Sequence, residues 1–180
     1  VSTTEIIQRI LTKTHNKDMT LPSKEELSQY SSAADGHHPH CYVYHNALDQ
    51  ILVQGGYEWE SGLPFYKFVS GDFDLFHIGH IEKLKKIRGG AARLIVVITT
   101  HDPCIMTLKE RVLSVLSCKY VDGVVIHTRS APLCRQDYSI DDPTLNDGKF
   151  SYLSKDTIVS RIQDQRDAYT ERNVKKGMSF

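Results

Sequence analysis

Residues 71–80 read Gly-Asp-Phe-Asp-Leu-Phe-His-Ile-Gly-His, and this stretch decides the fold. An extended run over 65–70 leads into it and an amphipathic run over 81–87 leads out of it, so the sequence predicts a strand that turns into a helix here. Backbone N–H groups at a helix start have no internal partners and attract anions. We therefore predict a phosphate site at this junction.

Two histidines carry the chemistry predicted for the junction. His77 and His80 lie three residues apart, so they project from one face of the helix start. A pair of imidazoles suits a polyphosphate whose negative charge grows during a reaction. Gly71 and Gly79 have no side chain and let backbone approach a ligand closely. We predict that His77 and His80 are catalytic.

A zinc site is one alternative for a His-x-x-His pair, but it needs further ligands. The chain has four cysteines, which form no Cys-x-x-Cys pair and lie far from these histidines in sequence. His37, His38 and His40 also suggest a metal, although a solvated loop is the simpler interpretation. We predict no metal site. Ordinary surface histidines are a second alternative for the pair.

Strand and helix patterns alternate along the rest of the chain. Residues 94–99 form a near-continuous apolar run, as a strand buried on both faces requires, and 121–126 form another. Helical periodicity covers 108–116 and 154–173. The alternation predicts an α/β fold with a parallel sheet and right-handed crossovers. Ligands of such sheets bind at the carboxyl ends of the strands, where the histidine pair falls.

The segments outside this alternation are harder to interpret. Residues 2–13 predict a helix, and the Ser-, Pro- and Gly-containing composition after them is typical of a connector. Local patterns predict a helix at 24–30 capped by Ser23, a strand at 41–45, a helical turn over 47–53 and a loop over 129–149.

Composition excludes several classes of function. The chain has 180 residues and 40% apolar content, enough for a domain with a sizeable core. Lys plus Arg and Asp plus Glu both number 22, and this balance argues against non-specific nucleic-acid binding. We find no bilayer-spanning apolar run and no secretory signal pattern, so we expect a cytoplasmic protein with free thiols.

Three stretches resemble the cytidylyltransferase type of nucleotidyltransferase. Residues 71–80 are similar to the family signature Gly-x-Phe-Asp-x-x-His-x-Gly-His. Residues 106–122 are similar to the family's Glu-Arg helix with its closing Cys-Arg-Tyr-Val-Asp, and 153–162 to the Ile-Ser-Thr-Thr helix start that closes the nucleotide site. The tail at 172–177 resembles the end of the ethanolamine-phosphate branch, of fungal type. The resemblance implies the Rossmann-like parallel sheet of the HxGH superfamily.

The same resemblance implies substrates and contacts. CTP and phosphoethanolamine would be the substrates of a step in phospholipid synthesis, which suggests a place peripheral to the endoplasmic reticulum. Mg²⁺ would accompany the triphosphate. Arg111 would add a bidentate phosphate contact, and Ser154 would bind the β/γ end of the triphosphate. The predicted nucleotide-binding residues are Gly71, Asp72, Phe73, Asp74, Gly79, Arg111, Ser154 and Lys155.

Several positions depart from the pattern of active members. The stretch 101–105 lacks the family's lysine, and Lys119 stands in place of an arginine. Tyr152 replaces a glycine beside the phosphate, and Lys155 replaces the second hydroxyl residue. We therefore expect a degenerate active site in this half of an enzyme. The alternatives are a working variant site, a non-catalytic nucleotide-binding or scaffold domain with a regulatory role, and an unrelated α/β nucleotide-binding module.

Residues 1–10 repeat residues 153–162. The identical pairs are Ser2 and Ser154, Ile6 and Ile158, Arg9 and Arg161, and Ile10 and Ile162. Chance similarity of two amphipathic helix starts is the alternative to a duplicated protein. Duplication predicts that 1–13 are the last helix of a preceding repeat, 14–62 an inter-domain connector and 63–180 a C-terminal cytidylyltransferase-like domain. The partner would be the N-terminal repeat, which a homodimer would replace in this fragment.

Overall fold

The computed structural model describes residues 3–12, 18–32, 40–90, 93–100, 103–128, 135–145 and 154–175. The predictions for His37, His38 and Tyr152 lie outside these residues.

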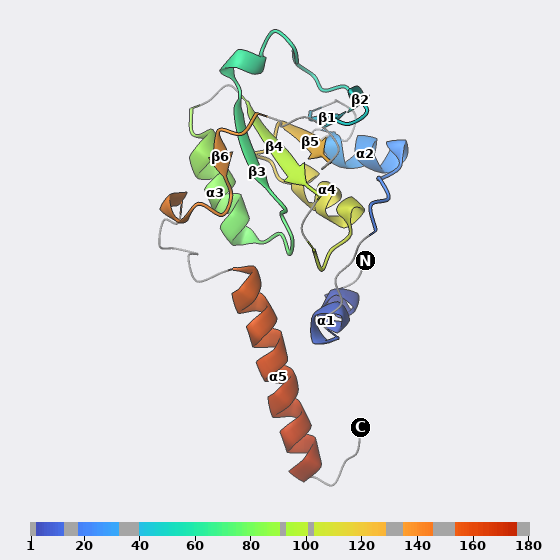
Figure 1. Cartoon of the computed structure of the whole chain (residues 1–180), viewed down its shortest axis with the longest axis vertical. Coiled ribbons are helices and arrows are strands. Elements are labelled where there is room, and N and C mark those ends of the chain that lie inside the picture. Colours follow the sequence, from blue (N-terminus) through green and yellow to red (C-terminus); the bar gives the residue numbers. More distant parts are fainter. Residues whose placement is uncertain are drawn as a thin grey trace.

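A six-stranded sheet forms the centre of the described part, with strand order β2-β1-β5-β4-β3-β6 (Figure 1). The strands are β1 Tyr42–His45, β2 Gln50–Val53, β3 Lys67–Gly71, β4 Leu94–Thr99, β5 Gly123–His127 and β6 Tyr138–Ser139. The pairs β1–β5, β5–β4, β4–β3 and β3–β6 are parallel, and β1–β2 is antiparallel. The predicted α/β fold with a mostly parallel sheet is confirmed.

The helices begin at signals that are visible in the sequence. They are α1 Thr3–Leu11, α2 Lys24–Ser31, α3 Ile78–Arg88, α4 Leu108–Leu116 and α5 Lys155–Lys175, with 3₁₀ turns at Leu63–Phe65 and Pro143–Leu145. Ser23 caps α2 and Thr107 caps α4, each in a reciprocal capping box with a glutamate three residues on. The helices predicted at 2–13, 24–30, 81–87, 108–116 and 154–173 are confirmed, with small shifts at their ends.

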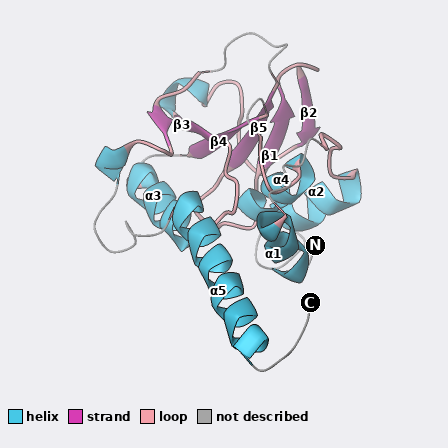
Figure 2. Cartoon of the chain, turned by 60° about the horizontal axis from the view of Figure 1, so that its bottom comes forward, coloured by secondary structure: helices cyan, strands magenta, loops and turns pink. Residues whose placement is uncertain are grey.

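The two faces of the sheet are covered differently. Helices α2, α3 and α4 pack on one face, where Leu27, Leu84 and Val112 meet the buried valines of the strands (Figure 2). The other face carries an aromatic cluster in which Trp59 and other rings of the 54–66 segment cover Phe68. All six residues of β4 are buried, which agrees with the continuous apolar run that predicted this strand.

Two local predictions were wrong. The helical turn expected over 47–53 is instead β2, which forms a hairpin with β1 around Asp49, a residue with a positive φ of 47°. The short apolar run 50–53 is compatible with either a helix or a strand, and pairing with β1 makes it a strand. The loop expected over 129–149 contains β6, which adds to β3 at the sheet edge.

The segment predicted as a connector, 14–62, includes β1 and β2, so the sheet extends into it.

None of the described helices is long and apolar enough to cross a membrane. Among the described residues, Cys41, Cys104 and Cys118 are buried.

Candidate functional site

The loop between β3 and α3 is held in an unusual conformation. Phe73 and Leu75 have positive φ values of 54° and 49°, although neither is glycine. Such residues cost about 1 kcal/mol or more each and persist only where the surroundings hold them in place. Phe73 is fully buried in the main core, and Leu75 packs against Ile105 and Met106. The loop is therefore built into the core.

The two predicted catalytic histidines form the start of α3. The Gly79 N–H donates to His77 Nδ1 at 2.9 Å, and the His77 N–H donates to His80 Nδ1 at 3.1 Å. The two ring centroids are 4.0 Å apart. Because each Nδ1 accepts a hydrogen bond from backbone, the proton of each neutral ring is on Nε2. Both rings are only partly buried, so each retains an Nε2–H donor beside the helix N-terminus.

The surroundings keep this pair neutral. Burial, with smaller contributions from His77 and Lys83, lowers the pKa of His80 to about 3. Burial, and then Lys83, lower the pKa of His77. The Phe76 ring stacks on the His80 ring at a centroid distance of 5.5 Å and an interplanar angle of 8°. Each neutral imidazole can donate an Nε2–H bond to an anionic ligand. Because neither ring is charged, the two rings do not repel each other.

Lys83 is a site residue that the sequence reasoning missed. Its Nζ donates to the Ile140 carbonyl at 2.9 Å, which ties α3 to the residue after β6. Its position three residues after His80 on the same helix was the available signal. Lys83 adds positive charge to the histidine side of the site, as its effect on both imidazole pKa values shows.

The low pKa of His80 makes a testable prediction about pH. The unfolded chain binds more protons than the folded chain between the ordinary value of 6.5 and about 3. Stability from the neutral ring is therefore complete above pH 6.5 and is lost as the pH falls through this window. Long-range ¹H–¹⁵N NMR of the imidazoles at pH 6 should show His80 neutral and protonated at Nε2. His80→Asn should flatten the dependence of stability on pH, and a His80 that titrates near 6.5 would contradict this picture.

Asp74 holds the loop together from within. Its side chain is 1% exposed, and its carboxylate accepts backbone N–H bonds from Leu75 at 3.1 Å, Ile105 at 2.8 Å and Met106 at 2.9 Å. The Lys155 Nζ is 2.6 Å from Asp74 Oδ2. Asp74 thus joins the β3–α3 loop, the segment before α4 and the first residue of α5.

Arg111 lies beneath the site. Its side chain is 1% exposed, and Nη1 donates to the carbonyls of Asp72 and Thr99, both at 2.9 Å. These bonds join the carboxyl ends of β3 and β4. Its Nε has no hydrogen-bond partner among the described atoms. The bidentate phosphate contact predicted for Arg111 stays a prediction.

The other predicted nucleotide contacts also have structural partners. A Cβ on Gly71 would lie 2.3 Å from Ile140 Cγ2, so glycine is what lets β6 approach β3. Asp72 Oδ1 accepts the Asp74 N–H at 3.0 Å. Ser154 Oγ accepts the Thr157 N–H at 3.1 Å and so caps α5. The structure brings these residues to the carboxyl edge of the sheet, and their contact with a nucleotide stays a prediction.

The N-terminal helix α1 covers the outer side of the loop. Ile6 and Ile10 join Leu75, Ile105 and Met106 in one apolar cluster that also includes residues of α5. Arg9 Nη1 lies 2.6 Å from Glu110 Oε1 and also donates to the Ile105 carbonyl at 3.3 Å. Burial alone would raise the pKa of Glu110, but hydrogen bonds from Arg9 and Thr107 outweigh this effect, so the pKa is lowered.

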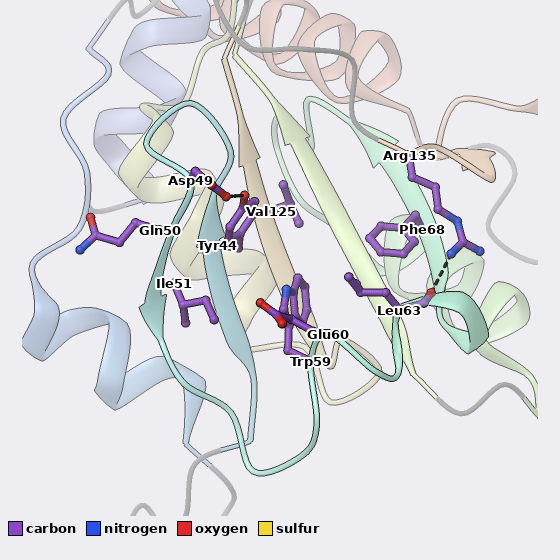
Figure 3. Close-up of a pocket in the computed structure, with 10 residues that line it drawn as sticks. All are labelled: Tyr44, Asp49, Gln50, Ile51, Trp59, Glu60, Leu63, Phe68, Val125 and Arg135. Carbon is purple, nitrogen blue, oxygen red and sulfur yellow. Dashed lines mark hydrogen bonds between the residues drawn. The ribbon is translucent and has the colours of Figure 1, made fainter.

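A separate cavity of about 620 Å³ opens on the aromatic face of the sheet (Figure 3). Its walls include Tyr44, Trp59 and Phe68, and Asp49 and Glu60 add carboxylates. None of the predicted site residues lines it. Among the described residues, no cluster of three His, Cys, Asp or Glu side chains is arranged to hold a metal ion.

Comparison with known proteins decides the family. The Cytidylyltransferase-like family model matches residues 68–177. The chain belongs to this family. The matched range includes the histidine pair, Arg111 and the whole of α5.

The relatives reported for this chain are all named cytidylyltransferases. The ethanolamine-phosphate cytidylyltransferase of Saccharomyces cerevisiae is 49% identical over 195 aligned residues, which cover 100% of this chain and 59% of that protein. The enzyme of the same name from Dictyostelium discoideum is 36% identical over 70% of this chain and 39% of its own length. The choline-phosphate cytidylyltransferase of S. cerevisiae is 27% identical over 59% of this chain and 25% of its own length. The chain therefore spans less than two thirds of the length of each of these relatives.

Proposed function

We propose that this chain is the second repeat of an ethanolamine-phosphate cytidylyltransferase, which converts CTP and phosphoethanolamine to CDP-ethanolamine and pyrophosphate. The observation that carries the proposal is the pair of neutral imidazoles, His77 and His80, which keep their Nε2–H donors at the start of α3. The relative from S. cerevisiae, at 49% identity, supports the choice of substrates.

The reaction needs positioning more than covalent help from the protein. A phosphate oxygen of phosphoethanolamine forms a bond to the α-phosphorus of CTP as the bond to pyrophosphate breaks. The nucleophile is already anionic, so the main barrier is the approach of two negative groups. Donors such as His77 and His80 stabilise the charge of the transition state, and a donor of this kind contributes about 2.7–4 kcal/mol.

In the proposed reaction, Mg²⁺ would be bound to the triphosphate of CTP. The carboxylate of Asp74 already has three N–H donors and Lys155, so this buried acid does not fit the role of a metal ligand. The ion would shield the triphosphate charge.

Lys155 supports a degenerate site in this half. Active members of the family have a hydroxyl residue at this position, whereas here Lys155 pairs with Asp74 at 2.6 Å. Its charge is thus neutralised within the protein, and the residue directly after Ser154 offers no hydroxyl to bind phosphate. We propose that the preceding repeat carries most of the turnover. A non-catalytic domain that binds nucleotide or acts as a scaffold is the second candidate, and the same ion pair favours it.

The test compares CDP-ethanolamine formation by two proteins, the 180-residue chain alone and the chain preceded by the N-terminal repeat. We expect turnover by the two-repeat protein and less than about 1% of it by the chain alone, because the loss of even one phosphate donor of this kind costs about 2.7–4 kcal/mol. Turnover by the chain alone at a comparable rate would contradict the degenerate site, and an inactive two-repeat protein would contradict the function.

A further inference from the structure

The cavity on the aromatic face of the sheet lies apart from the predicted nucleotide site. Its volume of about 620 Å³ is within the range of small-molecule sites, and Val125 and Phe68 are buried members of its wall (Figure 3). Helices α3 and α4, which carry His80 and Arg111, pack on the opposite face of the sheet. A ligand in this cavity would therefore leave the predicted nucleotide contacts untouched.

Two aromatic rings form a fixed part of the wall. Trp59 is 8% exposed, and its ring centroid lies 6.2 Å from that of Tyr44. The rings of Tyr42 and Tyr66 pack around the indole at centroid distances of 5.1 and 6.4 Å, so its neighbours hold Trp59 in place. Because this wall is already ordered, binding against it costs little conformational entropy.

Two carboxylates add negative charge to the same wall. Asp49 Oδ1 accepts a hydrogen bond from the Tyr44 hydroxyl, and this neutral donor leaves the charge of Asp49 unbalanced. Figure 3 shows the Glu60 carboxylate beside Trp59, and Glu60 forms no ion pair with any residue that the structure describes. Both acidic side chains are exposed, so a ligand can reach them from solvent.

The charge of the lining cation is already balanced. Among the ten residues that line the cavity, Arg135 is the only cation, and its guanidinium lies 4.9 Å from the centroid of the Phe68 ring. It donates to the carbonyls of Leu63 and Tyr66 at 2.7 and 2.9 Å, and it pairs with Asp137 at 3.1 Å. The unbalanced charge that remains in the cavity is therefore negative.

We propose that this cavity binds an organic ammonium ion, which is a protonated amine or a quaternary ammonium group on an apolar body. The ammonium group lies against the rings of Tyr44 and Trp59, beside the carboxylates. The apolar body packs on Val125. Aromatic faces attract cations, and the carboxylates of Asp49 and Glu60 repel anions. A neutral ligand gains nothing from these charges, so the wall selects for a cation.

The test uses the fluorescence of Trp59, which is the only tryptophan in the chain and therefore reports on this cavity. The probes are 2-phenylethylamine, which is a cation at neutral pH, and 2-phenylethanol, which has the same apolar body without the charge. We expect saturable changes in Trp59 emission and a Kd for the amine at least about tenfold lower than that for the alcohol, since the amine adds a cation–π contact and two carboxylates.

Two variants show whether the charges cause this preference. Asp49→Asn with Glu60→Gln keeps the shape of the wall and removes its charge, so we expect the amine and the alcohol to bind with equal Kd. Glu58→Gln is the matched control, because Glu58 is an exposed carboxylate of the same segment that does not line the cavity. This control should keep the preference for the amine. Circular dichroism checks that each variant is folded.

Three results would overturn the proposal. One is an equal Kd of the amine and the alcohol for the unsubstituted chain. Another is an unchanged Trp59 emission with both probes at millimolar concentration. The third is a Trp59 emission that depends on protein concentration without any probe, which would show that a second copy of the chain covers this face. None of these results depends on CTP, so the proposed function is tested separately.

Discussion

Replacement of Asp74 by alanine is expected to lower the free energy of unfolding by about 3–5 kcal/mol, because this buried carboxylate is the acceptor for several backbone N–H groups and the partner of the half-buried Lys155. The change leaves the N–H groups of Ile105 and Met106 without an acceptor inside the protein, and each buried unsatisfied donor costs about 1–3 kcal/mol. Lys155 also loses its partner. Urea unfolding monitored by circular dichroism measures the effect.

Two further variants separate the causes. Asp74→Asn keeps the volume but presents an amide N–H₂ where donors already converge, so we expect a loss nearly as large as for alanine. Lys155→Met leaves the carboxylate with its three N–H bonds, and we expect a clearly smaller loss. A change below about 1 kcal/mol for both Asp74 variants would contradict the bridging role of this residue.

The sequence predicts the elements of this fold best where the pattern is long and its ends are marked. Strand β4 and helix α4 have the predicted bounds, since a continuous apolar run and a Thr107 capping box define them. The histidine pair at the start of α3 was also predictable because the glycines and the strand-to-helix switch are local. By contrast, the short run 50–53 has no marked ends, and its partner strand decided its conformation.

The role of single site residues was less predictable because it depends on distant segments. Nothing near Asp74 in sequence indicates that the N–H groups of Ile105 and Met106 meet it. Likewise, the two carbonyls that bind Arg111 come from the ends of two different strands. The interpretation of these residues as nucleotide contacts followed from a family pattern, whereas the structure shows which atoms are already engaged.

Loss of CTP binding is the largest functional effect that we expect from the histidine pair. His77→Asn with His80→Asn keeps an acceptor near each Nδ1 position, so the N–H groups of Gly79 and His77 retain partners and α3 keeps its start. The double variant removes both Nε2–H donors. Hydrogen bonds to charged groups contribute about 1.5–3 kcal/mol each, so the Kd for CTP should rise at least about 100-fold.

The most direct test of this account is isothermal titration of CTP, with Mg²⁺, into the 180-residue chain and its variants. The controls are Ile78→Ala, which changes an exposed side chain between the two histidines, and His80→Gln, which keeps a donor near the Nε2 position. The account predicts binding by the unsubstituted chain and by Ile78→Ala, partial binding by His80→Gln, and none by the folded double asparagine variant. Equal affinity of the double variant and the unsubstituted chain, or no binding by the unsubstituted chain, would contradict the claim that the imidazole pair marks a triphosphate site.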